Sequence, residues 1–403
     1  MATESDKPTI GLGASFEFGA VDGIRTAALE HMNQLARHIK PGFTFPSNDL
    51  GPLAPMAGSW SGRGFNTIFR PLNSHSPNTL PIPATGDNIL ELNLTSESTV
   101  FSPISGAIPN RGMVQADIAL FGMTYLQQIS DVTTSPNVGI HIEPGIWLLI
   151  PQTADPANGP TVARMASIPH GTTINAQGTT RTFAGPPTIP AVDITPSFLS
   201  GAKHRFPSQT ATSLGMPRIP QDLTSFIAAG SITQAMLDDP NSVLRQAIAG
   251  QTITQTTEID ISTTGIPASP GSGGTDNIAF LLNGGEGQDS VANPQSPNAN
   301  AIRMNATFWI ETVERRIVIP PFWPGGPPVR VPLDSGRLGH SNRSIDIDPG
   351  RVVEKATVVT LLVTQIQYSQ TVFLNFNGLS WPHVSVATLM PSAPIPVPPS
   401  AWS

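Results

Sequence analysis

The sequence contains no cysteine. Disulfides, cysteine-ligated zinc, iron–sulfur clusters and thiolate catalysis are therefore excluded together. Any metal must be bound through histidine, through carboxylates or within an organic cofactor. The first residues carry neither a basic patch nor the apolar run of a secretory signal, so the expected compartment is the cytoplasm.

Charge is also scarce. Charged residues make up 12% of the 403 residues, and the net charge is −7 at pH 7. The 21 basic residues are scattered singly, so neither nucleic acid nor an anionic membrane surface is expected as a partner. No run approaches the ~18 consecutive apolar residues of a membrane-spanning helix. The expected partner is a small-molecule ligand.

Glycine and proline are plentiful, with 36 and 42 residues, while 39% of the chain is hydrophobic. This composition predicts a folded, mainly β protein in which strands are joined by long loops. Strand-like segments recur at short intervals between turn residues, which favours an antiparallel meander over βαβ units. The strand candidates are Asn88–Leu94, Ser98–Phe101, Ile118–Ile129, Gly139–Ile150, Thr161–Ser167, Gly171–Gln177, Thr252–Thr263, Ala301–Val318, Thr357–Phe376 and Trp381–Leu389.

The pattern of Asp22–Lys40 predicts one amphipathic helix ahead of the strands. We therefore expect an N-terminal helix and linker over 1–50 and a single elaborated β-barrel domain over 51–403. Within the barrel domain, loop-like composition indicates insertions at about 186–250, with a short helix at Asn241–Ala249, and at 267–300, and a Pro-rich loop at 320–350. We expect the aromatic part of that loop, Pro320–Pro328, to cover the barrel mouth together with the N-terminal helix.

Two strand segments carry histidines that a barrel wall would direct to one side. At a period of two, His383 shares a face with Ser385 and Ala387, so its imidazole would project from a surface of small side chains. His141 and Glu143 likewise share a face and are spaced for a histidine–carboxylate pair. The alternatives are a hydrogen-bonded strand histidine for His383 and a solvated polar edge for the pair.

The glycines of Gly58–Gly64 interrupt a strand pattern around Trp60, which is typical of the sharp bend in a closed, lipocalin-like barrel. This segment reads Gly-Ser-Trp-Ser-Gly-Arg-Gly, and four later segments follow it in order. Together they resemble the nitrobindin-like (THAP4-like) heme-binding β-barrels. The four segments are Met123–Gln127, His141–Trp147, Ile168–Thr172 and the closing Pro382–Leu389.

The resemblance implies a lipocalin- or nitrobindin-like barrel that binds heme b, with His383 as the iron ligand. It further implies that Trp60, Tyr125 and Trp147 lie around the cofactor. His141, Glu143 and His170 are the candidates for acid–base work, because they are the titratable residues within the matching segments. The chain departs from the family in its length and in the residues after His383, where the small and apolar positions are shifted by one.

Three functions follow as hypotheses. The first is a heme protein that acts on NO, peroxynitrite or peroxide, or that catalyses a heme-dependent conversion; as an enzyme it would be isomerase- or peroxidase-like. The second is a cofactor-free, lipocalin-like binder or enzyme of an apolar small molecule. The third is a structural or assembly protein, which low charge and long Pro/Thr-containing loops favour.

Overall fold

The computed structural model describes residues 50–155, 157–198, 200–264, 274–277, 298–333 and 344–402. The chain divides into two units, Met1–Ser47 and Asn48–Ser403, and all described residues belong to the second. The expected helix at Asp22–Lys40 and most of the 267–300 segment lie outside the described residues. None of the helices in the described ranges is long and apolar enough to cross a membrane.

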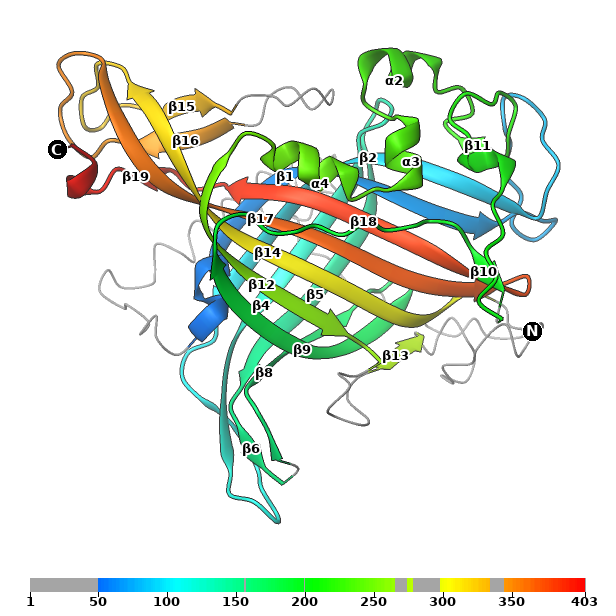
Figure 1. Cartoon of the computed structure of the whole chain (residues 1–403), viewed down its shortest axis with the longest axis horizontal. Helices are drawn as coiled ribbons and strands as arrows, with labels where there is room; N and C mark the ends of the chain where they lie inside the picture. The colour runs from blue at the N-terminus through cyan, green and yellow to red at the C-terminus, as the bar shows by residue number, and fades with distance from the viewer. Residues whose placement is uncertain are drawn as a thin grey trace, which may run out of the picture. The chain divides into compact units, whose positions relative to one another are not determined.

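Ten long antiparallel strands of the described chain form a closed barrel (Figure 1). Each strand pairs with the next one along the barrel, and β1 pairs with both β2 and β18, which closes the wall. The prediction of a mainly β, closed antiparallel barrel is therefore confirmed. The strands are β1 (Gly58–Pro71), β2 (Asn88–Pro103), β4 (Ile118–Asp131), β5 (Val138–Ile150), β8 (Thr161–Ser167), β9 (Thr172–Ala184), β12 (Thr252–Ser262), β14 (Asn300–Ile319), β17 (Thr357–Phe376) and β18 (Leu379–Pro391).

Glycines in β1 permit this closure. A Cβ atom at Gly62 would lie 2.0 Å from the carbonyl oxygen of Thr388, and one at Gly64 would lie 2.2 Å from that of Val386. Because no side chain fits at such distances, only glycine allows β1 to approach β18 this closely. The glycines of β1 thus serve the closure of the barrel, as the sequence predicted.

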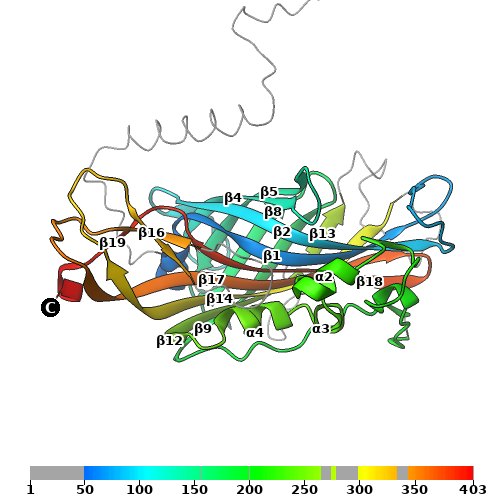
Figure 2. The same cartoon turned by 90° about the horizontal axis from the view of Figure 1, so that it is seen from above.

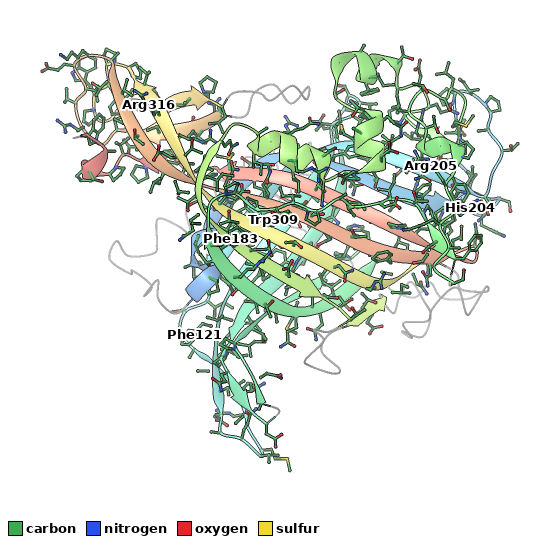
Figure 3. The ribbon with its side chains drawn as sticks, in the orientation of Figure 1. Phe121, Phe183, His204, Arg205, Trp309 and Arg316 are labelled. Carbon is green, nitrogen blue, oxygen red and sulfur yellow. The ribbon has the colours of Figure 1, made fainter. Side chains whose placement is uncertain are left out.

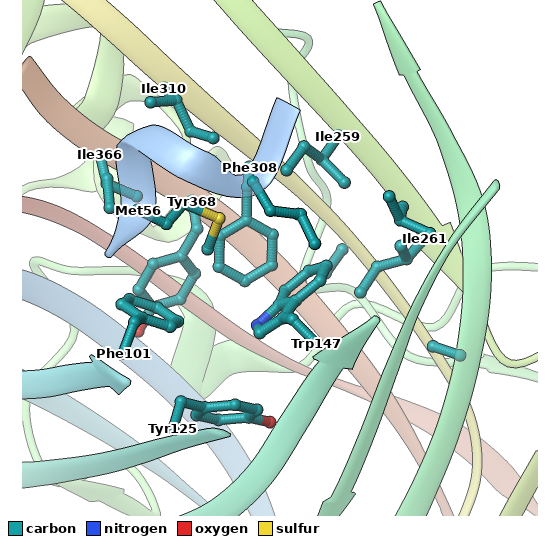
Figure 4. Packing of buried hydrophobic residues seen from close by; sticks show 14 of the residues in the cluster. Met56, Phe101, Tyr125, Trp147, Ile259, Ile261, Phe308, Ile310, Ile366 and Tyr368 are labelled. Atoms are coloured by element: carbon teal, nitrogen blue, oxygen red, sulfur yellow. The ribbon is translucent and has the colours of Figure 1, made fainter. Parts of the chain in front are cut away.

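One end of the barrel is filled by apolar side chains. The short helix η1 (Gly51–Met56) packs Leu53 and Met56 into the inner cluster, and the indole Nε1 of Trp60 donates a 2.7 Å hydrogen bond to the carbonyl of Met56. Figure 4 shows Met56 above the rings of Phe308 and Tyr368. We call this the η1 end.

The segment between β9 and β12 covers the outer side of β17 and β18, as both views show (Figures 1 and 2). A second apolar cluster fills the space beneath it and contains Phe69 and Trp381 from the barrel wall. The expected helix at 241–249 is present as α4, but α2 and α3 were not anticipated because helices of so few residues carry no readable period. The elements are β10 (Ser197–Phe198), η2 (Pro207–Gln209), β11 (Arg218–Ile219), α2 (Thr224–Ala229), α3 (Gln234–Asp238) and α4 (Ser242–Ile248).

Arg218 organises this covering segment. Its guanidinium is fully buried and donates only to backbone carbonyls, with no carboxylate in hydrogen-bond contact. Burial lowers its pKa below the ordinary arginine value, with Asp222 acting in the opposite direction. The accepting carbonyls belong to Ser208, Thr210, Ala211, Ser213, Pro220 and Gln221.

Beyond the η1 end, β14 and β17 extend into a separate small sheet of β15 (Val329–Pro332), β16 (Ser344–Asp348) and β19 (Ile395–Pro396). Figure 3 labels Arg316 in this extension. Phe322 is buried in the apolar cluster of this sheet, whereas Trp323 is 61% exposed. The expectation that both rings cover the barrel mouth is wrong: they lie beyond the η1 end, and Phe322 packs against Val353 there.

An arm also projects from the η1 end, and Figure 3 labels Phe121 at its root. It contains the start of β4, the β5–β8 connection and several short strands. The remaining short elements of the described chain are β3 (Ile108–Asn110), β6 (Thr153–Ala154), β7 (Ala157–Asn158), β13 (Gly274–Asn277) and η3 (Pro399–Trp402).

A buried carboxyl group on β14 makes stability depend on pH. Glu311 is fully buried and accepts a 2.5 Å hydrogen bond from the amide nitrogen of Gln365. Burial raises the pKa of Glu311 from 4.5 to about 7, and the Gln365 hydrogen bond only partly opposes this. Between these two values the folded state holds a proton that the unfolded state releases, so stability from this group falls as pH rises through the window.

We expect Glu311→Gln to stabilise the protein at pH 8 by ~1–3 kcal/mol, because the amide replaces a group that must ionise while buried. The variant and the wild type should converge at pH 4.5, where the carboxyl group is protonated in the folded state. Urea unfolding at both pH values measures this. Glu314→Gln, at an exposed position of the same strand, is the control and should change stability little at either pH. An equal effect of both variants would contradict the explanation.

Candidate functional site

Strand register brings the predicted site residues to the inner face of the barrel. In the β4–β5 pair, Gln127 lies opposite Glu143 and Ile129 lies opposite His141. Directly paired residues share one face of a sheet, so these side chains line the interior together. The interior is therefore polar along part of its length, in contrast to the apolar η1 end.

The centre of this polar region is a buried ion pair. The Arg164 Nη2 atom lies 2.5 Å from Glu143 Oε1, and the two side chains are 2% and 0% exposed. Tyr125 donates its hydroxyl proton to the same Oε1 atom and accepts a 2.9 Å hydrogen bond from Arg164 Nε. Arg164 Nη1 completes the set by donating to Gln370 Oε1 at 2.6 Å. Every nitrogen of the guanidinium thus has a partner.

These contacts determine the charge states. Burial by itself would raise the pKa of Glu143, but the Arg164 charge outweighs it and, with hydrogen bonds from His141 and Tyr125, lowers that pKa to about 2. Burial also raises the pKa of the Tyr125 hydroxyl well above its ordinary value. At neutral pH the site therefore holds a carboxylate, a guanidinium and a neutral phenol.

Aromatic rings surround the guanidinium. The Cζ atom of Arg164 lies 5.5 Å from the ring centre of Tyr125, 5.8 Å from that of Trp147 and 5.4 Å from that of Phe308. Ring faces carry partial negative charge, so they stabilise a cation that has lost its water. Trp147 and Tyr125, which the resemblance placed around a cofactor, lie beside Arg164.

A second buried carboxyl group lies in the same interior. Glu97 accepts hydrogen bonds from the Tyr368 hydroxyl at 2.6 Å and the Thr95 hydroxyl at 2.9 Å. Gln127 Nε2 lies 3.4 Å from Glu97 Oε2 and 3.3 Å from the Tyr368 oxygen. Burial raises the pKa of Glu97, because these hydrogen bonds and the more distant His141 only partly offset the loss of water.

Histidines occupy the barrel end opposite η1. His141 Nε2 lies 3.1 Å from Glu143 Oε2, and the His170 ring meets the His141 ring edge-on with 5.0 Å between centres. His170 lies in the turn between β8 and β9, and burial, followed by the charge of His141, lowers its pKa. The predicted candidates His141, Glu143 and His170 are thus brought together. We call this the histidine end.

His383 lies at this end too, on a different wall. Its register partner Val372 faces the inner cluster, which confirms that His383 points inward with Ser385. Asn66 Nδ2 donates to His383 Nε2 and to Ser385 Oγ, each at 2.7 Å. Burial, then the charges of His141 and His170, lowers the pKa of His383 to about 3, so its imidazole is neutral at pH 7.

Sequence reasoning missed several residues of this site. Arg164 and Glu97 went unnoticed. Arg164 shares its strand face with Val162 and Ala166, whereas Glu97 shares its face with the polar Thr95 and Thr99. The charge on an otherwise small and apolar face is the signal that could have identified Arg164, and no such signal marks Glu97. Trp60, expected beside a cofactor, lies at the η1 end, away from the histidines.

No group of three or more His, Asp or Glu side chains in the described part of the chain is placed to hold a metal ion. An open groove of about 780 Å³ lies on the outer wall, where Thr124, Ile146 and Met165 contribute to its lining together with residues of β13. None of the three histidines lines it. Tyr125 also lines the groove, whereas Arg164 and Glu143 do not.

No family model and no curated protein matches this chain. Among solved structures, the chain is similar to the crystal structure of Rv2717c from M. tuberculosis, with 12% identity and a TM-score of 0.31. The match covers 87% of this chain and 99% of that chain. At this TM-score the likeness carries no functional conclusion.

The ion pair provides a stability test. Arg164→Met should cost ~3–5 kcal/mol, because it leaves the Glu143 charge buried without a partner, and adding Glu143→Gln should recover part of that loss. Urea unfolding of the two single variants and the double variant measures the coupling. Arg111→Met is the matched control: its ion pair with Asp117 is 78% and 47% exposed, so its loss should change stability little. Equal losses at both arginines would show that Glu143 is not charged.

Proposed function

We propose that the histidine end binds heme b, with His383 as the axial iron ligand, and that the protein acts on a small ligand at the open side of the iron. The observation that carries the proposal is a neutral, inward-facing imidazole on one wall and a second pair of imidazoles on another. His383 is on β18, whereas His141 is on β5, and β1, β2 and β4 lie between these strands along the shorter path around the wall.

The hydrogen bonds assign the His383 tautomer. The amide oxygen of Asn66 accepts from Asn93 Nδ2 at 3.2 Å, so its amide nitrogen is the atom that faces His383. An amide nitrogen only donates, so His383 Nε2 is the unprotonated nitrogen and Nδ1 carries the proton. This is the form that ligates iron, and a single neutral amide donor is all that the metal would displace from Nε2.

The donor set fits heme better than a bare ion. A bare metal ion needs several side-chain ligands, which the described residues do not bring together. Heme needs one axial side chain, because the porphyrin supplies the other nitrogens. Ile129 and Val372, each 7% exposed, are the register partners of His141 and His383 and add apolar surface at the same level.

When bound, the iron would supply an open coordination position for NO, peroxynitrite or a peroxide. The chain's own contribution would come from His141 and His170, which can hold or move a proton beside that ligand. Glu143 acts through His141, since its oxygens are all engaged within the protein. An isomerase- or peroxidase-like activity is consistent with this arrangement.

The competing function is a cofactor-free barrel. In that case the Asn66–His383 hydrogen bond would simply order the barrel end, and the histidines would contact an organic ligand directly. An assembly protein, the third hypothesis, would bind neither heme nor an organic ligand at the histidine end. Both alternatives predict that added hemin remains unbound.

Hemin titration distinguishes these functions. Wild-type protein and His75→Ala should each bind hemin with a Soret band that saturates at one equivalent, because His75 lies in an exposed loop. His383→Ala should lose that band while its far-ultraviolet circular dichroism stays unchanged. An unaltered Soret band in His383→Ala would refute the ligand assignment. Absence of the band in the wild type would favour the cofactor-free barrel.

A further inference from the structure

We infer that His141 is the proton acceptor of the histidine end: its unprotonated Nδ1 takes the proton of a weakly acidic small ligand, which then binds as its anion. This inference deepens the proposed function and rests on it for the identity of the binding site. The ligand class is a small acid HL, with hydrazoic acid as the probe. The proton moves from HL to Nδ1, giving L⁻ and an imidazolium, and no atom is oxidised or reduced.

The first step is the tautomer of His141. Glu143 Oε1 already accepts from Tyr125 and from Arg164, and Oε2 accepts from His141 Nε2. An ionised carboxylate has no proton to donate, so the hydrogen of that contact belongs to Nε2. A neutral His141 therefore has a bare lone pair on Nδ1.

The second step is that this orientation is rigid. Glu143 is fully buried, and its position is held by the guanidinium of Arg164, which is itself enclosed by aromatic rings. A carboxylate with all its partners in place cannot rotate to offer a different geometry to the imidazole. The buried Glu143 carboxylate thus determines which nitrogen of a neutral His141 carries the proton.

The third step is access. The His141 side chain is 15% exposed, and its Nδ1 has no hydrogen-bond partner among the described residues. The imidazole therefore lies between the buried carboxylate and solvent. His170, whose ring meets that of His141 edge-on, has its pKa lowered by burial and by the charge of His141.

Charges of both signs surround the position that the transferred proton would take on His141. The imidazolium would lie beside the Glu143 carboxylate, whose charge is compensated by Arg164. The other titratable groups that face this end are Glu97 on β2, His170 in the β8–β9 turn, Tyr368 on β17 and His383 on β18. A bound anion would offset the charge added to His141, so the pair is neutral overall.

The proton transfer can be tested with two probes on the hemin-loaded protein. Azide binds as the anion of a weak acid, whereas imidazole binds as a neutral base and needs no proton acceptor. His141→Leu should weaken azide binding on the order of tenfold, as expected from the loss of one charge-assisted hydrogen bond. Imidazole affinity should stay within about twofold, since no such bond is involved. Equal effects on both probes would show a merely structural role.

A second measurement does not depend on heme. In the apo protein with ¹⁵N-labelled histidine, the His141 signals should show a protonated Nε2 and an unprotonated Nδ1 near neutral pH, and Glu143→Gln should weaken this preference. His204→Ala, at an exposed position, serves to check the assignment. A protonated Nδ1 in the wild type would overturn the inference, whether or not hemin binds. The predicted tautomer without a Soret band would keep His141 as the proton acceptor and reject only the heme.

Discussion

The buried ion pair of Arg164 and Glu143 is the interaction on which the barrel interior depends. Two charges without water are costly, so each neighbour has to compensate: Tyr125 and Gln370 complete the hydrogen bonds, and aromatic rings surround the guanidinium. The pair also separates two environments, because apolar packing lies on its η1 side and imidazoles lie on the other. Without it, His141 would have no oriented partner.

Strand register makes this arrangement possible. Charges meet inside the barrel only because Trp147 and Arg164 pair directly, as do Gln127 and Glu143. A slip by one residue would turn the charged side chains to the outer face and bring apolar ones inward, so the polar interior and the register stabilise each other. The close approach of β1 to β18, which Gly62 allows, then closes the wall around them.

Sequence alone predicted most of the fold and part of the site. Alternation within a strand is local, so it placed His141 with Glu143 and directed His383 inward. It left residues 95–97 out of the two strand candidates, whereas Thr95 and Glu97 continue β2 and face a polar interior. The partnership of Glu143 with Arg164 depends on pairing between β5 and β8, which no local pattern encodes. For the same reason the packing of Phe322 in the cluster of the small sheet could not be predicted.

Arg218 shows how a long excursion of the chain can be ordered without a large core of its own. The peptide wraps around a single cation, and the carbonyls that face it come from residues 208–221. Lysine has three donors on a flexible stem, so it could not replace the planar fork, and some carbonyls would be left buried without a donor. The spacing of residues between 208 and 221 is therefore constrained by the geometry of one side chain. Insertions and deletions are therefore better tolerated outside residues 208–221, because inside this stretch they would move carbonyls away from the Arg218 guanidinium.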